Sequence, residues 1–202
     1  MRLAFSALTV FVLGLLPLAH GASIVFDPAA FRVDGLHESL AISSAAPSLA
    51  WRFTSNTRGA VQSAYQLRAS VNGEPAWETE LIRSNISRRQ WEGRALTSRD
   101  RVAWQVQAWD ERGQSTGWSE PPATFEVALL QKSDWVGSWI TNERFVTNAT
   151  SLPYFAREFE LECAEVDRAR LHHVGLGLGV TTINGKNVSR EVLAPGLTTY
   201  NK

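Results

Sequence analysis

Three glutamates alternate with apolar residues in the C-terminal third of the chain. They are Glu158, Glu160 and Glu162, separated by Phe159 and Leu161. A pair of carboxylates with different pKa values can act as general acid and base. However, residues i and i+2 of a strand lie about 7 Å apart on one open face, where nothing raises the pKa of either. We therefore interpret the three glutamates as the solvated face of a strand and not as a catalytic pair.

The segment Gly175-Leu176-Gly177-Leu178-Gly179 has glycines spaced as in a nucleotide-binding loop. A dinucleotide fingerprint needs a strand before the glycines, a helix after them and an acidic residue further on. Here β-rich residues 180–183 follow and lead to a turn. We therefore expect the glycines to lie where two strands pack closely and a side chain would clash, and we predict no cofactor.

His172 and His173 are the candidate metal ligands. Neighbouring residues of a strand point to opposite faces, so these two cannot bind one ion without distortion, and the sequence offers no third ligand nearby. Cys163, the only cysteine, stands in the apolar register of a strand and is interpreted as a buried, inert thiol. The sequence thus predicts no catalytic, cofactor-binding or metal-ligating residue.

Tryptophan is the remaining residue type that could bind a ligand. The chain contains eight tryptophans, and an aromatic ring offers a broad apolar face of the kind that stacks on a sugar. The candidates lie near predicted loops or opposite the predicted core: Trp77, Trp91, Trp109 and Trp118. The alternative is that these rings cover the core or a domain interface, and the sequence leaves both open.

The first residues have the pattern of a secretion signal. Arg2 precedes an apolar run over residues 3–18, and Ala19-His20-Gly21 offers small residues at the cleavage positions. The run is short and broken by a proline, which disfavours a membrane span. We expect a signal peptide at 1–21, a mature chain beginning near Ala22, a secreted, extracellular protein and no membrane association after cleavage.

Charge and cysteine content limit the possible partners of the protein and the interactions that stabilise its fold. Twenty basic and 20 acidic residues give a net charge of +0, which offers no electrostatic case for a nucleic-acid partner. A single cysteine provides no disulfide framework, so ordinary cores must stabilise the fold. Candidate N-glycosylation sequons begin at Asn85, Asn148 and Asn187.

Alternating apolar residues predict an all-β fold. Residues 64–71 form one such pattern, and Asn72-Gly73 after them favours a tight hairpin turn. The clearest strand is predicted at residues 101–109. Its inward set is Val102, Trp104, Val106 and Ala108, and its outward set is Arg101, Gln105 and Gln107.

About seven strands in about 100 residues predict a β-sandwich of the immunoglobulin or fibronectin type III kind over residues 24–128. The lack of disulfide cysteines favours the fibronectin-like version. A second domain is predicted over residues 135–202. Its strands are expected at 154–163, 169–174 and 179–183, with a hairpin turn at Asn184-Gly185.

The order and spacing of several short motifs resemble the N-terminal region of α-L-rhamnosidases of glycoside hydrolase family 78. The resemblance covers about residues 33–202. The motifs are Pro47-Ser48-Leu49-Ala50-Trp51, Trp104-Gln105-Val106-Gln107-Ala108-Trp109-Asp110, Gly117-Trp118-Ser119-Glu120-Pro121, Ser133-Asp134-Trp135, Tyr154-Phe155-Ala156-Arg157-Glu158-Phe159, Ile183-Asn184-Gly185-Lys186 and Val192-Leu193-Ala194-Pro195-Gly196.

The resemblance implies a fibronectin-like domain followed by the first half of a second, jelly-roll-like sandwich. Full members resemble inverting enzymes that hydrolyse terminal α-L-rhamnose with two acidic residues on an (α/α)6 barrel, and that barrel lies beyond residue 202. We therefore expect a fragment: the non-catalytic N-terminal portion, inactive alone, of an enzyme whose partners are rhamnose-containing glycosides. The alternative is a free-standing secreted module that binds carbohydrate or a surface.

Overall fold

The computed structural model describes residues 22–37, 40–142, 153–162, 165–192 and 194. The chain divides into two compact units, Met1–Trp139 (unit 1) and Ile140–Lys202 (unit 2). Among the described residues the regular structure is β-strand, apart from two 3₁₀ turns, η1 (Pro28–Ala30) and η2 (Lys132–Asp134). The all-β class is therefore confirmed. The predicted signal peptide, Cys163 and Asn148 lie outside the described residues.

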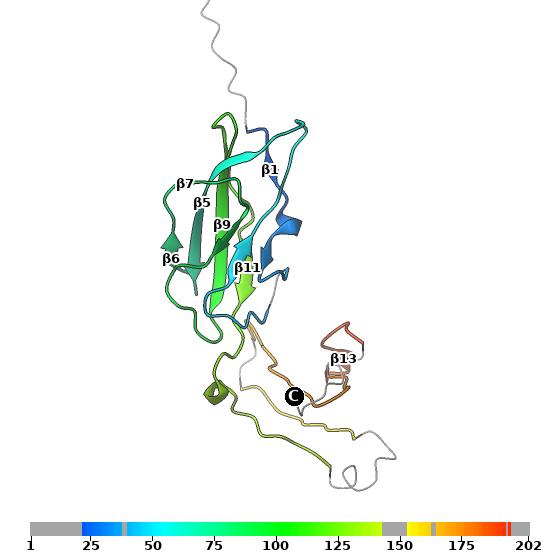
Figure 1. Ribbon diagram of the computed structural model, residues 1–202. Helices are drawn as coiled ribbons and strands as arrows, with labels where there is room; N and C mark the ends of the chain where they lie inside the picture. Colours follow the sequence, from blue (N-terminus) through cyan, green and yellow to red (C-terminus); the bar gives the residue numbers. More distant parts are fainter. Residues whose placement is uncertain (1–21, 38–39, 143–152, 163–164, 193, 195–202) are drawn as a thin grey trace, which may run out of the picture. The chain divides into compact units, whose positions relative to one another are not determined.

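The larger sheet of unit 1 is built on two long, adjacent antiparallel strands, labelled β5 and β9 in the upper part of Figure 1. Its strands are β5 (Gln62–Val71), β6 (Glu74–Glu78), β7 (Ile82–Arg83), β9 (Arg101–Asp110), β10 (Ser115–Trp118) and β11 (Ala123–Glu126). β5 and β9 pair along nearly their whole length, from Gln62 opposite Asp110 to Val71 opposite Val102. β6 and β7 pair with the free edge of β5, and β10 and β11 pair with that of β9.

A smaller sheet and a two-stranded ladder complete unit 1. The smaller sheet has the order β2 (Arg32–Val33), β3 (Ser48–Ala50), β8 (Arg88–Gln90), and the ladder pairs β1 (Val25–Phe26) with β4 (Phe53–Thr54). Aromatic pairs join the smaller sheet to the larger one. The Phe31 ring, next to β2, stacks on Trp104 of β9 at 5.2 Å, and the Trp51 ring, next to β3, meets Tyr65 of β5 at 4.8 Å.

The core between these elements contains the residues that alternation marks as inward. Leu49, Leu67 and Val106 have no exposed surface, and Trp104 is 1% exposed. A buried side chain of this size stabilises the fold by about 1.5–3 kcal/mol relative to an exposed one. The interlocked apolar faces explain why unit 1 needs no disulfide.

The hairpin between β5 and β6 forms as predicted. Asn72 and Gly73 both have positive φ, 55° and 91°, as the tight turns that suit a right-twisted hairpin require. The Asn72 side chain adds a second function, because its amide donates to Asp100 Oδ1 at 2.8 Å and its oxygen accepts the Arg101 N–H at 2.9 Å. The turn is thus tied to the start of β9.

One outward residue of β9 is not solvated. Gln105, predicted to face solvent, is 8% exposed. Its Nε2 donates to the Ser119 carbonyl and to Glu120 Oε1, each at 2.8 Å, and its Oε1 accepts Arg68 Nε at 2.9 Å. The prediction was wrong because Ser119 and Glu120, which follow β10 along the edge of β9, hydrogen-bond the amide, which is stable there since it is fully hydrogen-bonded.

Unit 2 has less regular structure. Its one described hairpin joins β12 (Thr182–Ile183) to β13 (Lys186–Asn187) through Asn184 and Gly185, with φ of 49° and 76°, so the predicted turn is confirmed. The strands predicted at 154–163 and 169–174 are wrong over their described residues, which have irregular backbone, and the one at 179–183 is limited to β12. A strand needs a partner for its N–H and C=O groups, and the described residues of those segments join no ladder.

Candidate functional site

The residues of unit 2 singled out for possible chemistry do not converge. Glu158, Glu160 and Glu162 are exposed on irregular backbone, so they form neither a strand face nor an enclosed acid–base pair. His172 and His173 are also exposed. Across the described parts of the chain, no group of three or more histidine, cysteine, aspartate or glutamate residues is arranged to hold a metal ion.

The glycine run is also not what the sequence predicted. A Cβ on Gly179 would meet nothing within 4 Å, so closely packed strands do not explain that residue. Gly177 has a φ of 117°, a conformation that glycine adopts readily and other residues avoid. The run is therefore explained at Gly177 by backbone conformation, and the clash interpretation was wrong at Gly179.

The candidate tryptophans separate into two pairs. Trp77 and Trp91 pack together with ring centroids 5.1 Å apart, and Trp91 is only 2% exposed. Trp91 therefore belongs to the core and Trp77 is partly buried against it, so for this pair the structure supports the alternative that the rings cover the core. Trp109 and Trp118 stay half-buried on β9 and β10, and Arg68 covers the Trp118 ring with its guanidinium carbon 4.3 Å from the centroid.

Close packing requires a glycine beside the first pair, at a position that the sequence did not reveal. A Cβ on Gly93 would lie 2.9 Å from Cζ2 of Trp91 and 2.9 Å from Cβ of Trp77. Gly93 follows Trp91 by two positions in an irregular segment. The W-x-G spacing is therefore the one signal in the sequence that could have found this contact.

The most elaborate polar site of unit 1 centres on Asp110, at the end of β9. Its carboxylate is fully buried and accepts the backbone N–H groups of Ser23, Arg112 and Gln114 at 2.8–2.9 Å. The Arg112 guanidinium adds a contact at 3.3 Å. Burial alone would raise the pKa of Asp110, but the hydrogen bonds from Ser23, Gln114 and Arg112 hold it far below its ordinary value.

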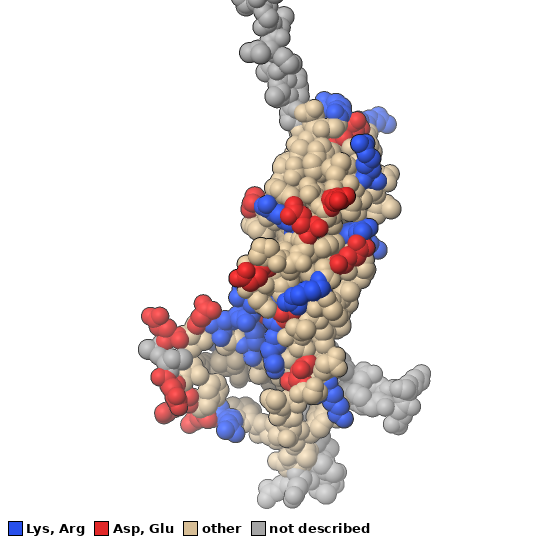
Figure 2. Space-filling view, turned by 90° about the vertical axis from the view of Figure 1, so that its left-hand side faces the viewer, with Lys and Arg blue, Asp and Glu red and all other residues tan. Residues whose placement is uncertain are grey.

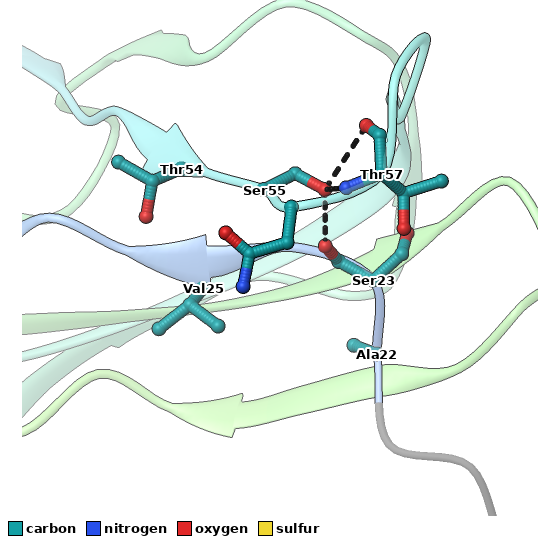
Figure 3. A pocket seen from close by; sticks show the side chains of 7 residues that line it. Ala22, Ser23, Val25, Thr54, Ser55 and Thr57 are labelled. Atoms are coloured by element: carbon teal, nitrogen blue, oxygen red, sulfur yellow. Dashed lines mark hydrogen bonds between the residues drawn. The ribbon is translucent and has the colours of Figure 1, made fainter.

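This carboxylate attaches the start of the described chain to the larger sheet. Ser23 is 87 positions away in sequence, and its hydroxyl also lies 3.5 Å from both carboxylate oxygens of Glu111. Beside it is a small depression of about 270 Å³. Figure 3 shows Ser55 there, donating to the Ser23 carbonyl at 2.5 Å and accepting the Thr57 N–H at 2.9 Å. The lining is mainly small and polar, and its groups bond to one another, so we interpret it as structural.

Asp100 has a similar function at the beginning of β9. Its carboxylate accepts Arg94 Nη1 at 2.9 Å, the Asn72 amide at 2.8 Å and the Thr97 N–H at 2.8 Å. Burial acts to raise the pKa of Asp100, but these hydrogen bonds outweigh it and the net pKa is lowered. Two buried aspartates thus fix the two ends of the central strand.

The surface of unit 1 carries both signs of charge. In the upper part of Figure 2, basic and acidic side chains lie among one another over this unit, as the net charge of +0 suggests. Within the described residues, no helix is both long enough and apolar enough to cross a membrane. Of the sequons, Asn85 is exposed between β7 and β8, and Asn187 is exposed in β13.

Comparison with known protein families identifies the family to which this chain belongs. A family model described as "Rha78A-like, N-terminal immunoglobulin domain" matches residues 28–131, which is just over half of the chain. The chain belongs to this family. A second model, "Alpha-L-rhamnosidase N-terminal domain", matches residues 164–202. The resemblance read from the motifs is therefore confirmed.

Several proteins that this chain is similar to are α-L-rhamnosidases. The chain is 33% identical over 185 residues to an α-L-rhamnosidase of Alteromonas sp. (strain LOR), and 33% identical over 186 residues to one of Formosa agariphila. Each match covers 84% of this chain but 20% of the relative. Among solved structures, the Streptomyces avermitilis α-L-rhamnosidase in complex with L-rhamnose matches with a TM-score of 0.54 and 26% identity, over 60% of this chain and 12% of that one.

Proposed function

We propose that this chain is the non-catalytic N-terminal portion of an α-L-rhamnosidase, an enzyme that removes terminal α-L-rhamnose from glycosides. The observation that carries the proposal is the 33% identity over 185 residues to an α-L-rhamnosidase. That match extends across both units rather than one common sandwich. A free-standing binding module would explain the sandwich alone, and the comparisons do not favour it.

In the proposed enzyme the chemistry belongs to another part of the protein. An inverting glycosidase uses two carboxyl groups about 6.5–9.5 Å apart, one as acid and one as base for a water. Among the described residues, the acidic groups that are buried, Asp100 and Asp110, are each saturated with hydrogen bonds and lie at opposite ends of β9. Their lowered pKa values suit structural anchors, whereas a general acid needs a raised one.

The role of unit 1 follows from its construction. A sandwich held by a continuous core and by anchored strand ends is a rigid support, which can pack against a catalytic domain and shape the approach of the substrate. We propose domain limits of 24–128 and 135–202. The strands from Val25 to Glu126 and the family match at 28–131 support the first of these.

Two assays test the proposal. The purified 202-residue chain should give no turnover of 4-nitrophenyl α-L-rhamnopyranoside, and measurable turnover would overturn the non-catalytic assignment. In the second assay, this chain replaces the matching fifth of the Alteromonas relative. We expect the chimera to fold and hydrolyse the same substrate, whereas an unrelated fibronectin-type domain of equal length in that place should give unstable protein. Equal behaviour of the two chimeras would contradict the proposed role.

We also propose that the protein is secreted and glycosylated. The pattern of residues 1–21 and the exposed Asn85 and Asn187 support this. Expressed with its own leader in a secreting eukaryotic host, the protein in the medium should begin at Ala22 and lose mass on treatment with a peptide N-glycosidase. Retention in the cell with residues 1–21 attached would contradict secretion.

A further inference from the structure

We infer that a groove on the outer face of the smaller sheet, formed around Ala50 and three arginines, is a binding site for an oxyanion, a sulfate or a carboxylate. We take the oxyanion to be part of a glycan, and this part of the proposal rests on the proposed function. The binding of an oxyanion in the groove is argued from the residues of the groove alone.

Strand register places the arginines in a row. Ala50 of β3 lies directly opposite Arg32 of β2 on one side and Arg88 of β8 on the other. Residues directly opposite one another in an antiparallel pair point to the same face with Cβ atoms about 4.5–5.5 Å apart. Two long cationic side chains therefore flank a methyl group. Because Ala50 is small, the space between the arginines is open.

A third arginine closes the row. The Trp51 side chain is buried in the core, so Arg52, next in the chain, points to the outer face with Ala50. The residues enclose a depression of about 490 Å³, whose lining includes Arg32, Arg52, Arg88, Ala50, Ser48 and Asp34. A sulfate or a uronate ring fits easily within a space of this size.

The charges of these three arginines are not matched by an ion pair among the described residues, in contrast to those of four other arginines in unit 1. Arg89, Arg94, Arg101 and Arg112 pair with Glu92, Asp100, Glu126 and Asp110. Over the described parts of the chain, Arg32, Arg52 and Arg88 form no such salt bridge. The three guanidinium charges outnumber the one carboxylate of the lining, that of Asp34, so an anion between them is stabilised by the remaining positive charge.

The remaining contacts suit a site for an anion. Asp34, the one acidic residue of the lining, already accepts the Ser48 backbone N–H at 2.8 Å through its Oδ1. Arg32 is held in place because its Nη1 donates to the carbonyls of Ala29 and Phe31 at 2.7 and 2.8 Å. The planar guanidinium fork matches sulfate and carboxylate oxygens in pairs, so arginine suits this recognition better than lysine.

The test is a titration of the full 202-residue chain at constant ionic strength. Binding is monitored through the chemical shifts of the backbone amides. Sodium sulfate and sodium D-glucuronate are the oxyanion probes, which distinguish a sulfate ester from a uronate as the source, and sodium chloride and neutral L-rhamnose are the controls. We expect one or both oxyanions to shift the amides of β2, β3 and β8 with saturation in the millimolar range, and the controls to leave them unchanged.

Variants make the test specific. Arg52→Gln with Arg88→Gln should weaken oxyanion binding at least tenfold, and the corresponding lysine pair should restore part of it. Arg32 is left intact because it also supports the backbone. Arg58→Gln with Arg83→Gln removes the same charge from exposed positions outside the groove lining and should leave affinity unchanged.

Two results would overturn the proposal. One is the absence of saturable shifts with either oxyanion, and the other is an equal loss of affinity in the two double variants, which would reveal non-specific charge screening. Because this readout does not depend on rhamnoside hydrolysis, failure of the chimera assay would leave it untouched. The inverse also holds.

Discussion

Apolar side chains have opposite environments in the two units. In unit 1, Leu67 and Val106 have no exposed surface, whereas Phe159 and Leu161 of unit 2 are 72% and 59% exposed. The local patterns are alike, since both alternate apolar with polar residues. The difference is that β5 and β9 have ladder partners on both edges and a facing sheet, and residues 153–162 join no ladder among the described residues. Burial, and with it stability, comes from these partners rather than from the alternation itself.

The largest expected effect separates the two units directly. Trp104→Ala removes a buried ring that stacks on Phe31, so it should lower the free energy of unfolding by about 4 kcal/mol. Phe159→Ala removes an exposed ring and should change it by less than about 0.5 kcal/mol. Urea denaturation of the full chain, followed by far-UV circular dichroism, measures both. If the alanine variant does not fold, Trp104→Phe can be measured instead, with a smaller expected loss of unfolding free energy. Similar losses of unfolding free energy for Trp104→Ala and Phe159→Ala would contradict the difference in burial between the two units.

The next effect concerns the anchor at Asp110. Asp110→Asn keeps the shape but loses the charge that three backbone N–H groups and Arg112 satisfy, so it should cost about 2 kcal/mol at pH 7. Glu158→Gln, on an exposed carboxylate of unit 2, should cost nothing measurable. Thermal unfolding of the two variants against the unsubstituted chain gives the comparison.

The same anchor predicts a pH dependence. The pKa of Asp110 is lowered from 3.8 in the folded protein, so its stabilisation is present above the unfolded value and is lost as the pH falls through the folded one. Asp100 acts in the same direction. Between about pH 5 and pH 2 the unsubstituted chain should lose more stability than Asp110→Asn. Parallel pH profiles for the two proteins would show that Asp110 is not the anchor.

A smaller effect compares the two hairpin turns. Gly73 and Gly185 both have positive φ and open space where a methyl group would lie, so alanine at either position strains only the backbone, by about 1 kcal/mol. Gly73→Ala should lower the global unfolding free energy by that amount, because its hairpin belongs to the larger sheet. Gly185→Ala should leave global unfolding unchanged. An equal effect of both changes would mean that unit 2 unfolds together with unit 1.

Local signals explain what the sequence could predict. The two Asn-Gly turns and the inward set of β9 depend on residues within a few positions of one another, and they were found. The features that were missed depend on distant residues. The bond from Ser23 to Asp110 spans 87 positions, and Gln105 is buried by residues that follow β10.

The candidate sites show the same limit. The sequence left open whether Trp91 binds a sugar or covers the core, and only the structure shows its ring packed on Trp77 and against Gly93. The arginine groove is invisible in the sequence, since Arg32, Arg52 and Arg88 become neighbours only when β2, β3 and β8 align. A pattern along one strand reveals which side faces inward, but it does not reveal what lies opposite.

The central claim is that unit 1 folds on its own core while the described segments of unit 2 have no comparable protection. Amide hydrogen exchange on the 202-residue chain tests it most directly. We predict slow exchange, governed by global unfolding, for the amides of β5 and β9, and exchange near the unprotected rate for residues 153–162 and 165–174. Protection of the latter residues equal to that of β9 would contradict the account.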